Sequence, residues 1–178
     1  MKIRESKGFT LIELLIVVAI IGIIAAIAVP GLLRARMSGN EASAIGSMRA
    51  INSGESTYSS SCANGGYAVS LKDLVTPPAG STSAFVSPDL STNGVLKSGY
   101  LVTLAAGTTN NVVTTMASTC NGSLNDALSS YFAEAHPNQL GSSGQRSFGT
   151  DQRGTVFQNP TGTAFTAALV ASSTNPIQ

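Results

Sequence analysis

Residues 8–29 read GFTLIELLIVVAIIGIIAAIAV, an apolar run that contains one carboxylate, Glu13, and no basic residue. As a helix, the part from Phe9 to Val29 would be about 31 Å long, which matches the hydrocarbon thickness of a bilayer. An ionised acid inside such a segment costs about 2.5–3.5 kcal/mol at the bilayer centre, so its presence indicates a function. The run therefore predicts a membrane-spanning helix in which Glu13 has a specific partner.

A short basic segment, MKIRESKG, precedes this run. Its three basic residues outnumber its one acid, which favours a cytoplasmic N-terminus, although Arg34 and Arg36 beyond the run bring the charge count close to a tie. If a peptidase cut after Gly8, the new α-amino group of Phe9 would lie about one helical turn from Glu13. A cation and an anion would then share the start of the helix.

Two ordinary segments could also produce an apolar run of this length. A secretory signal has a shorter apolar region with its cleavage site after it, whereas the cleavage cue here comes before the run. A plain single-pass anchor explains the length but explains neither Glu13 nor the Gly8–Phe9 pair. Both are weaker explanations than a processed segment with a functional carboxylate.

The stretch from Lys7 to Pro30 resembles the N-terminal signal of type IV pilins and of type II secretion pseudopilins. The resemblance implies that a prepilin peptidase removes Met1–Gly8 and methylates the amino group of Phe9. It also implies that Phe9 and Glu13 act in assembly, in which identical subunits form a helical filament. The partners it implies are the prepilin peptidase, the inner-membrane pilus assembly machinery and, before assembly, membrane lipid.

Four segments follow from this interpretation. They are a cleaved leader (1–8), a transmembrane or filament-core helix (9–29), an amphipathic continuation of that helix (30–58) and a globular head (59–178). The expected location is the bacterial inner membrane, with a single pass and a cytoplasmic N-terminus. After assembly, the chain would lie in an extracellular pilus or a periplasmic pseudopilus.

The second half of the predicted helix has a different pattern from the first. Pro30 and Gly31 predict a helix kink or local melting, because proline removes a backbone donor and glycine frees a torsion. Beyond them, apolar side chains recur at the spacing of one helical face, with charged side chains expected on the wet side. The apolar set is Leu33, Met37, Ala44, Met48, Ile51 and Tyr58, and the charged set is Arg34, Arg36, Glu41, Arg49 and Glu55.

A small antiparallel sheet should cover this apolar face, giving an α+β fold. Residues 99–105 and 129–135 are rich in β-branched and aromatic side chains, and SFGTD and GTVFQN flank a hairpin turn with Gly154. The segment from Ser130 to Phe157 also resembles, more weakly, the sheet region of bacterial pilin-like proteins.

Two shorter segments also carry local signals. Ser70–Val75 predicts a short helix with Ser70 as its cap and Asp73 closing a capping box. Ala164–Val170 favours a strand, and the tail after it is left unassigned.

The two cysteines, Cys62 and Cys120, predict a disulfide, because they form an even count in a segment expected outside the cytoplasm. A pair of buried free thiols is the alternative. A metal site is a weaker prediction than a disulfide, since two thiols and the only histidine, His136, do not complete a zinc site. His136 precedes Pro137 and is expected in a turn.

Composition excludes several function classes. No nucleophile elbow, zinc-protease motif or phosphate-binding loop occurs, so we expect neither an enzyme nor a cofactor nor a metal. Loss of the leader removes three basic residues and one acid, which lowers the formal charge from +1 to −1 and argues against nucleic acid as a partner. A major pilin is therefore the leading hypothesis; the alternatives are a pseudopilin, or a minor pilin that acts as an adhesin or DNA-binding module.

Overall fold

The computed structural model describes residues 8–177, so the leader is outside the described residues except for Gly8. Helix α1 (Leu11–Ser61) is the first element. The chain divides into two compact units at Arg36 and Met37, and α1 contributes to both.

The first unit consists of the apolar part of α1 and the residues before it. Here the helix is unbroken through Pro30 and Gly31, so the predicted local melting is wrong. A proline inside a helix removes a single backbone donor, and the turns on either side keep their own hydrogen bonds. A kink at this pair, without melting, stays a prediction.

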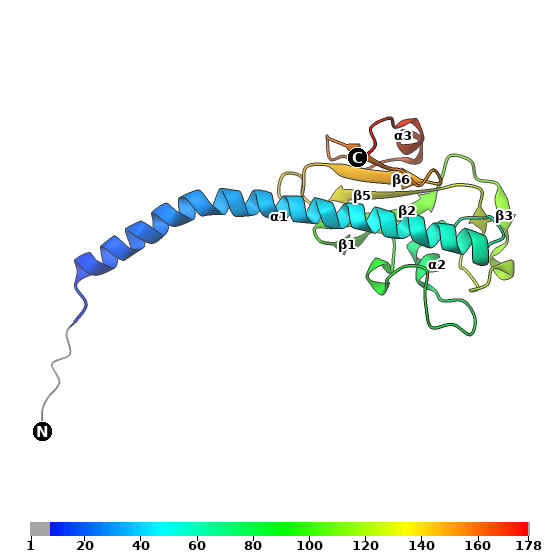
Figure 1. The fold of residues 1–178 in the computed structure, drawn as a ribbon, viewed down its shortest axis with the longest axis horizontal. Coiled ribbons are helices and arrows are strands. Elements are labelled where there is room, and N and C mark those ends of the chain that lie inside the picture. The colour runs from blue at the N-terminus through cyan, green and yellow to red at the C-terminus, as the bar shows by residue number, and fades with distance from the viewer. Residues whose placement is uncertain (1–7, 178) are drawn as a thin grey trace, which may run out of the picture. The chain divides into compact units, whose positions relative to one another are not determined.

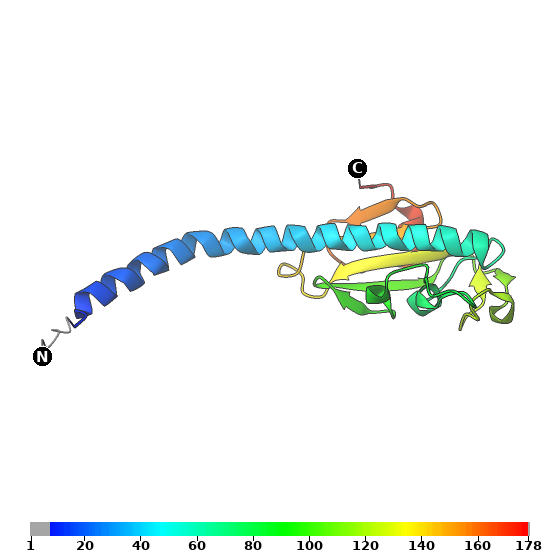
Figure 2. The same cartoon turned by 60° about the horizontal axis from the view of Figure 1, so that its bottom comes forward.

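The second unit is built on a five-stranded antiparallel sheet of order β1-β2-β5-β6-β7. Figures 1 and 2 show the cyan part of α1 lying against this sheet, which confirms the α+β class. The strands are β1 (Val95–Lys97), β2 (Tyr100–Ala106), β5 (Tyr131–Pro137), β6 (Ser147–Asp151) and β7 (Val156–Asn159). The other elements are β3 (Val112–Thr114) paired with β4 (Ala127–Leu128), helices α2 (Leu71–Val75) and α3 (Ala167–Ser172), and 3₁₀ turns η1 (Pro88–Leu90) and η2 (Met116–Ser118).

The core lies between the second half of α1 and the inner face of the sheet. Four residues of the predicted apolar face are buried there, together with large side chains from β2 and β6. The buried helix residues are Ala44, Met48, Ile51 and Tyr58, and the sheet residues include Tyr100, Val102, Leu104 and Phe148. Glu41 and Glu55 are buried as well, so their expected place on the wet side is wrong. Both carboxylates accept hydrogen bonds from the head.

The hairpin between β6 and β7 is confirmed. Thr150 pairs with Val156, and Gly154 has φ 71°, a conformation that favours glycine. The short helix α2 is also confirmed, since the Ser70 side chain accepts a hydrogen bond from Lys72 N. Asp73, however, does not close a capping box: its carboxylate accepts from Leu124 N at 2.7 Å and from the Asn125 amide at 2.9 Å.

The C-terminal segment covers the outer face of the sheet, and its predicted strand is wrong. Helix α3 forms there, capped by Thr166, whose side chain accepts from Leu169 N. Phe165 and Val170 pack against β6 at Gly149, where an added Cβ would lie 2.8 Å from each of their side chains. The local cap and this bare strand position favour the helix over a strand. His136 also differs from expectation, because it lies in β5 and not in a turn.

Candidate processing and assembly site

The N-terminus of α1 brings together three of the predicted functional residues. Gly8 and Phe9 precede the helix, and the Phe9 side chain is 84% exposed. Thr10 N and Thr10 Oγ1 donate to Glu13 Oε2 at 2.9 and 2.6 Å, and Glu13 N donates to Thr10 Oγ1 at 3.3 Å. This reciprocal arrangement is a capping box, which satisfies donors that the first helical turn would otherwise leave open.

The capping box uses only one of the two oxygens of Glu13. Both bonds from Thr10 reach Oε2, and within residues 8–177 no hydrogen bond to Oε1 is made. The carboxylate can therefore hold its position in the helix and still accept from a second group. Sequence analysis did not identify Thr10, although the pattern Thr-x-x-Glu before an apolar run is a readable signal.

The helix surface after Glu13 is apolar on all sides. The large apolar side chains from Phe9 to Leu33 are exposed by at least 48%, and an 18-residue window of α1 has a mean hydropathy of 3.1 with no part buried. Among the described residues, α1 is the one helix that is long and apolar enough to cross a membrane. Such a surface fits membrane anchoring.

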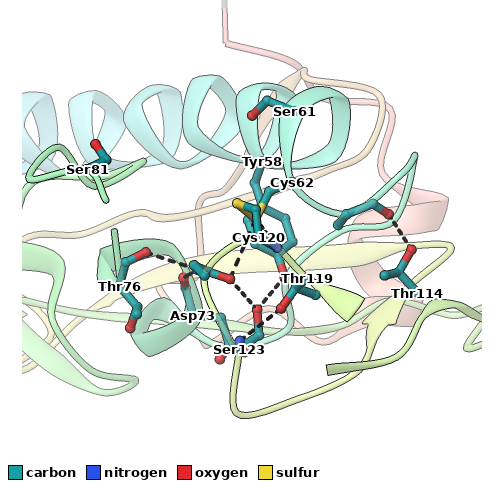
Figure 3. Close-up of a disulfide and its surroundings, with 12 residues drawn as sticks. Tyr58, Ser61, Cys62, Asp73, Thr76, Ser81, Thr114, Thr119, Cys120 and Ser123 are labelled. Carbon is teal, nitrogen blue, oxygen red and sulfur yellow. Dashed lines mark hydrogen bonds between the residues drawn. A yellow bond between two sulfur atoms is a disulfide. The ribbon is translucent and has the colours of Figure 1, made fainter. Parts of the chain in front are cut away.

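A disulfide joins Cys62, directly after α1, to Cys120. Figure 3 shows the bridge beneath the last turn of the helix, with Tyr58 and Ser123 beside it. The hydroxyls of these two residues are 2.6 Å apart, and Cys120 N donates to Cys62 O at 3.2 Å. The end of α1 is thus fixed to a distant loop by covalent and polar contacts.

Glu41 fixes the other end of the buried helix segment. Its carboxylate accepts from Gln145 N at 3.0 Å and from the Arg146 guanidinium at 2.6 and 2.9 Å. Burial alone would raise the pKa of Glu41, but the hydrogen bonds from Gln145 and Arg146 outweigh it and hold that pKa below its usual value. The ionised form therefore helps to hold the β5–β6 connection on α1.

Glu55 is the opposite case. Its side chain is fully buried; Oε2 accepts from Ala68 N at 2.9 Å, while Oε1 has no partner among the described residues. Burial raises the pKa of Glu55 well above its usual value, and the nearby Asp73 carboxylate adds to the effect. Burial therefore favours the neutral form of Glu55.

Two further sequence predictions concern His136 and metal binding. His136 Nδ1 lies 2.9 Å from Glu134 Oε2 on the outer face of the sheet. In the part of the chain that the structure describes, no group of three or more His, Cys, Asp or Glu side chains is placed to hold a metal ion.

Comparison with known proteins identifies the N-terminal segment. Residues 3–29 match the family model described as a prokaryotic N-terminal methylation motif. The chain is 63% identical over 38 residues to the type IV wide pilus major component PilA4 of Thermus thermophilus, a match that covers 21% of this chain and 29% of that protein. It is 42% identical over 54 residues to the type IV major pilin protein PilA of Myxococcus xanthus, covering 30% of this chain and 24% of that one.

The chain spans less than a third of the length of either relative. The range of the family model includes the apolar run and its capping box. No solved structure matches the chain. In its N-terminal segment the chain has the methylation motif, and it is similar to two type IV major pilins.

Proposed function

We propose that this chain is the major structural subunit of a type IV pilus. The observation that carries the proposal is the start of α1, where a single carboxylate stands at the head of an otherwise apolar, exposed helix surface. Both relatives are named as major pilus components, and the methylation motif matches residues 3–29, which include that segment. The proposal gives the chain no enzymatic activity and no cofactor.

The apolar part of α1 serves in two environments under this proposal. In the inner membrane, Phe9–Val29 spans the bilayer with the leader on the cytoplasmic side, and a prepilin peptidase cuts between Gly8 and Phe9 and methylates the new amine. In the filament, the same surface packs against neighbouring copies. Hydrophobicity does not choose between these states, because lipid tails are as apolar as leucine.

Glu13 is the residue that would favour the filament over the membrane. Its Oε1 has no bond among the described residues, so it can accept from the α-amine of Phe9 of a neighbouring subunit while Thr10 keeps Oε2 in place. A buried ion pair of this kind specifies register, as a polar residue does in a coiled coil. The filament would thus contain an interaction that lipid cannot offer.

The first test is to shear filaments from cells and analyse them by intact mass and electron microscopy. A major pilin would appear as the dominant fibre protein, beginning at methylated Phe9 and lighter by two hydrogens because of the Cys62–Cys120 bridge. A processed chain found only in the membrane would contradict the proposal and indicate a pseudopilin or a minor subunit. Gly8→Val should leave a full-length, unprocessed chain, and normal cleavage of that variant would refute the assigned cut.

The role of Glu13 needs variants that separate its charge from its capping bond. Glu13→Gln keeps an oxygen for Thr10 and removes the charge, whereas Thr10→Ala removes the cap and keeps the charge. We expect Glu13→Gln and Glu13→Ala to insert normally into membranes but to yield few filaments, with Thr10→Ala much less affected. An undiminished filament yield from Glu13→Ala would refute the role in assembly.

A further inference from the structure

A polar pocket of about 520 Å³ lies on the second unit, beside the last turns of α1. The hairpin turn between β6 and β7 forms one side of it, and the chain just after α1 forms the other. Its size falls within the range of about 300–1,000 Å³ that is usual for small-molecule sites. It is separate from the N-terminal assembly segment, and no residue of that segment lines it.

Two tyrosines give the pocket an aromatic wall. The rings of Tyr67 and Tyr131 are 5.1 Å apart at 50°. Tyr131 is buried, and its hydroxyl donates to Asn52 Oδ1 at 3.0 Å, which fixes its ring. Tyr67 is half-buried, and among residues 8–177 its hydroxyl makes no hydrogen bond to protein. The bond to Asn52 therefore fixes the wall at Tyr131, and the Tyr67 hydroxyl remains available to a ligand.

Neutral polar side chains surround this wall. Asn52 is engaged at both ends of its amide, because the NH₂ group donates to Gly154 O at 2.9 Å and the oxygen accepts from Tyr131 and Thr150. In contrast, the side chains of Ser56, Ser59, Asn64 and Gln152 make no hydrogen bond to any described protein group. The pocket thus presents hydroxyls and amides, each of which can donate and accept.

The pocket carries no net charge that would select an ion. Among the residues that the structure describes, no carboxylate lines it, and Arg153 is the one charged lining residue. The Arg153 guanidinium lies 2.9 Å from Asp151 Oδ2, donates to Val170 O at 2.7 Å and stacks on the Phe157 ring. Because its charge is already paired, Arg153 is a poor anchor for an anion.

We propose that this pocket binds a neutral saccharide of one or two rings. A sugar ring has an apolar face that packs on an aromatic side chain and a rim of hydroxyls that pair with amides and hydroxyls. The half-buried ring of Tyr67, backed by the buried Tyr131, can pack on a sugar face. The unengaged groups around it and the paired charge of Arg153 meet the remaining requirements. The site would let the head bind glycans, and it does not depend on the proposed role in a pilus.

The test is a calorimetric titration of the full chain with maltose, cellobiose and N,N′-diacetylchitobiose. The chain should be held in dodecylphosphocholine, because the sugar headgroup of a maltoside detergent would compete for the pocket. We expect saturable binding of at least one disaccharide. Gln152→Ala should weaken it about threefold to tenfold, as expected for a lost hydrogen bond, and Tyr67→Ala should weaken it by about tenfold or more.

Two further variants make the result decisive. Gln139→Ala is the matched control, because Gln139 is an exposed glutamine away from the pocket, and it should bind as the wild type does. Tyr67→Phe keeps the ring and should retain most of the binding. If Tyr67→Ala does not fold, Gln152→Ala against Gln139→Ala decides the test. Absence of binding to all three sugars, or binding unaffected by Gln152→Ala and by folded Tyr67→Ala, would overturn the proposal.

Discussion

The two halves of α1 have the same secondary structure but meet different surroundings. From residue 11 to 36 the large apolar side chains are exposed, whereas from residue 37 to 61 an apolar face is buried against the sheet. The carboxylates differ in the same way: within residues 8–177, Glu13 is bound only by its own helical turn, while Glu41 and Glu55 are bound by the head. The second half is stabilised within its own chain, whereas the exposed apolar surface of the first half fits membrane anchoring.

The largest effect should come from the same substitution made in each half. Ile51 is fully buried and Ile20 is 51% exposed. Ile51→Ala should lower the free energy of unfolding of the head by about 2–5 kcal/mol, because it leaves a cavity in the core. Ile20→Ala should change it by less than about 0.5 kcal/mol. Chemical unfolding followed by tyrosine near-UV circular dichroism would measure both, and equal losses would refute the comparison.

The disulfide should have the next largest effect. It closes a loop with a sequence separation of 58 residues. Replacing Cys62 and Cys120 together by alanine should lower the free energy of unfolding of the head by up to about 4 kcal/mol in the chain-entropy model. The control is the wild type in reducing agent, which should approach the stability of the variant. An unchanged unfolding midpoint in both would show that the bridge is energetically neutral.

Glu55 predicts a smaller, pH-dependent effect. The folded state keeps its proton above pH 4.5, the usual pKa, where the unfolded chain releases it. As pH rises from about 4.5 towards the raised pKa, ionisation of Glu55 stabilises the unfolded chain. The free energy of unfolding therefore falls by up to about 1.4 kcal/mol per pH unit. Glu55→Gln should remove this loss, so its stability relative to wild type should increase between pH 4.5 and 7.

Glu41→Gln is the control of opposite sign. The lowered pKa of Glu41 means that its stabilisation is present above its unfolded pKa and is lost as pH falls through the folded value. The wild type should therefore exceed Glu41→Gln in stability near neutral pH, and the difference should shrink in acid. Parallel stability curves for wild type and Glu55→Gln would contradict the assignment of Glu55 as a neutral acid.

Sequence patterns predicted the elements whose formation depends on residues close together in the chain. The apolar run, the β6–β7 hairpin around Gly154 and the cap at Ser70 were all readable, because each rests on local periodicity or turn chemistry. The capping box of Thr10 and Glu13 has the same local character and could have been read too. The strand predicted at Ala164–Val170 failed, because Thr166 caps a helix whose packing depends on distant Gly149.

The contacts that cross the head could not be predicted in this way. Periodicity sorts residues by polarity, so it assigned Glu41 and Glu55 to the solvent side. Glu41 is bound by Arg146, 105 residues away, and a single sequence does not reveal such a pairing. The pocket beside Tyr67 and Tyr131 likewise joins segments that the chain order keeps apart.

The bridge between Cys62 and Cys120 also has a mechanical consequence. A force that pulls the two ends of the chain apart passes from Cys62 to Cys120 through the sulfur atoms, and the residues between them carry none of it. With 58 residues of separation at about 3.5 Å each, roughly 200 Å of contour length is withheld from extension. In a fibre under tension, each subunit could lengthen only through the rest of its chain, and reduction would release the hidden length.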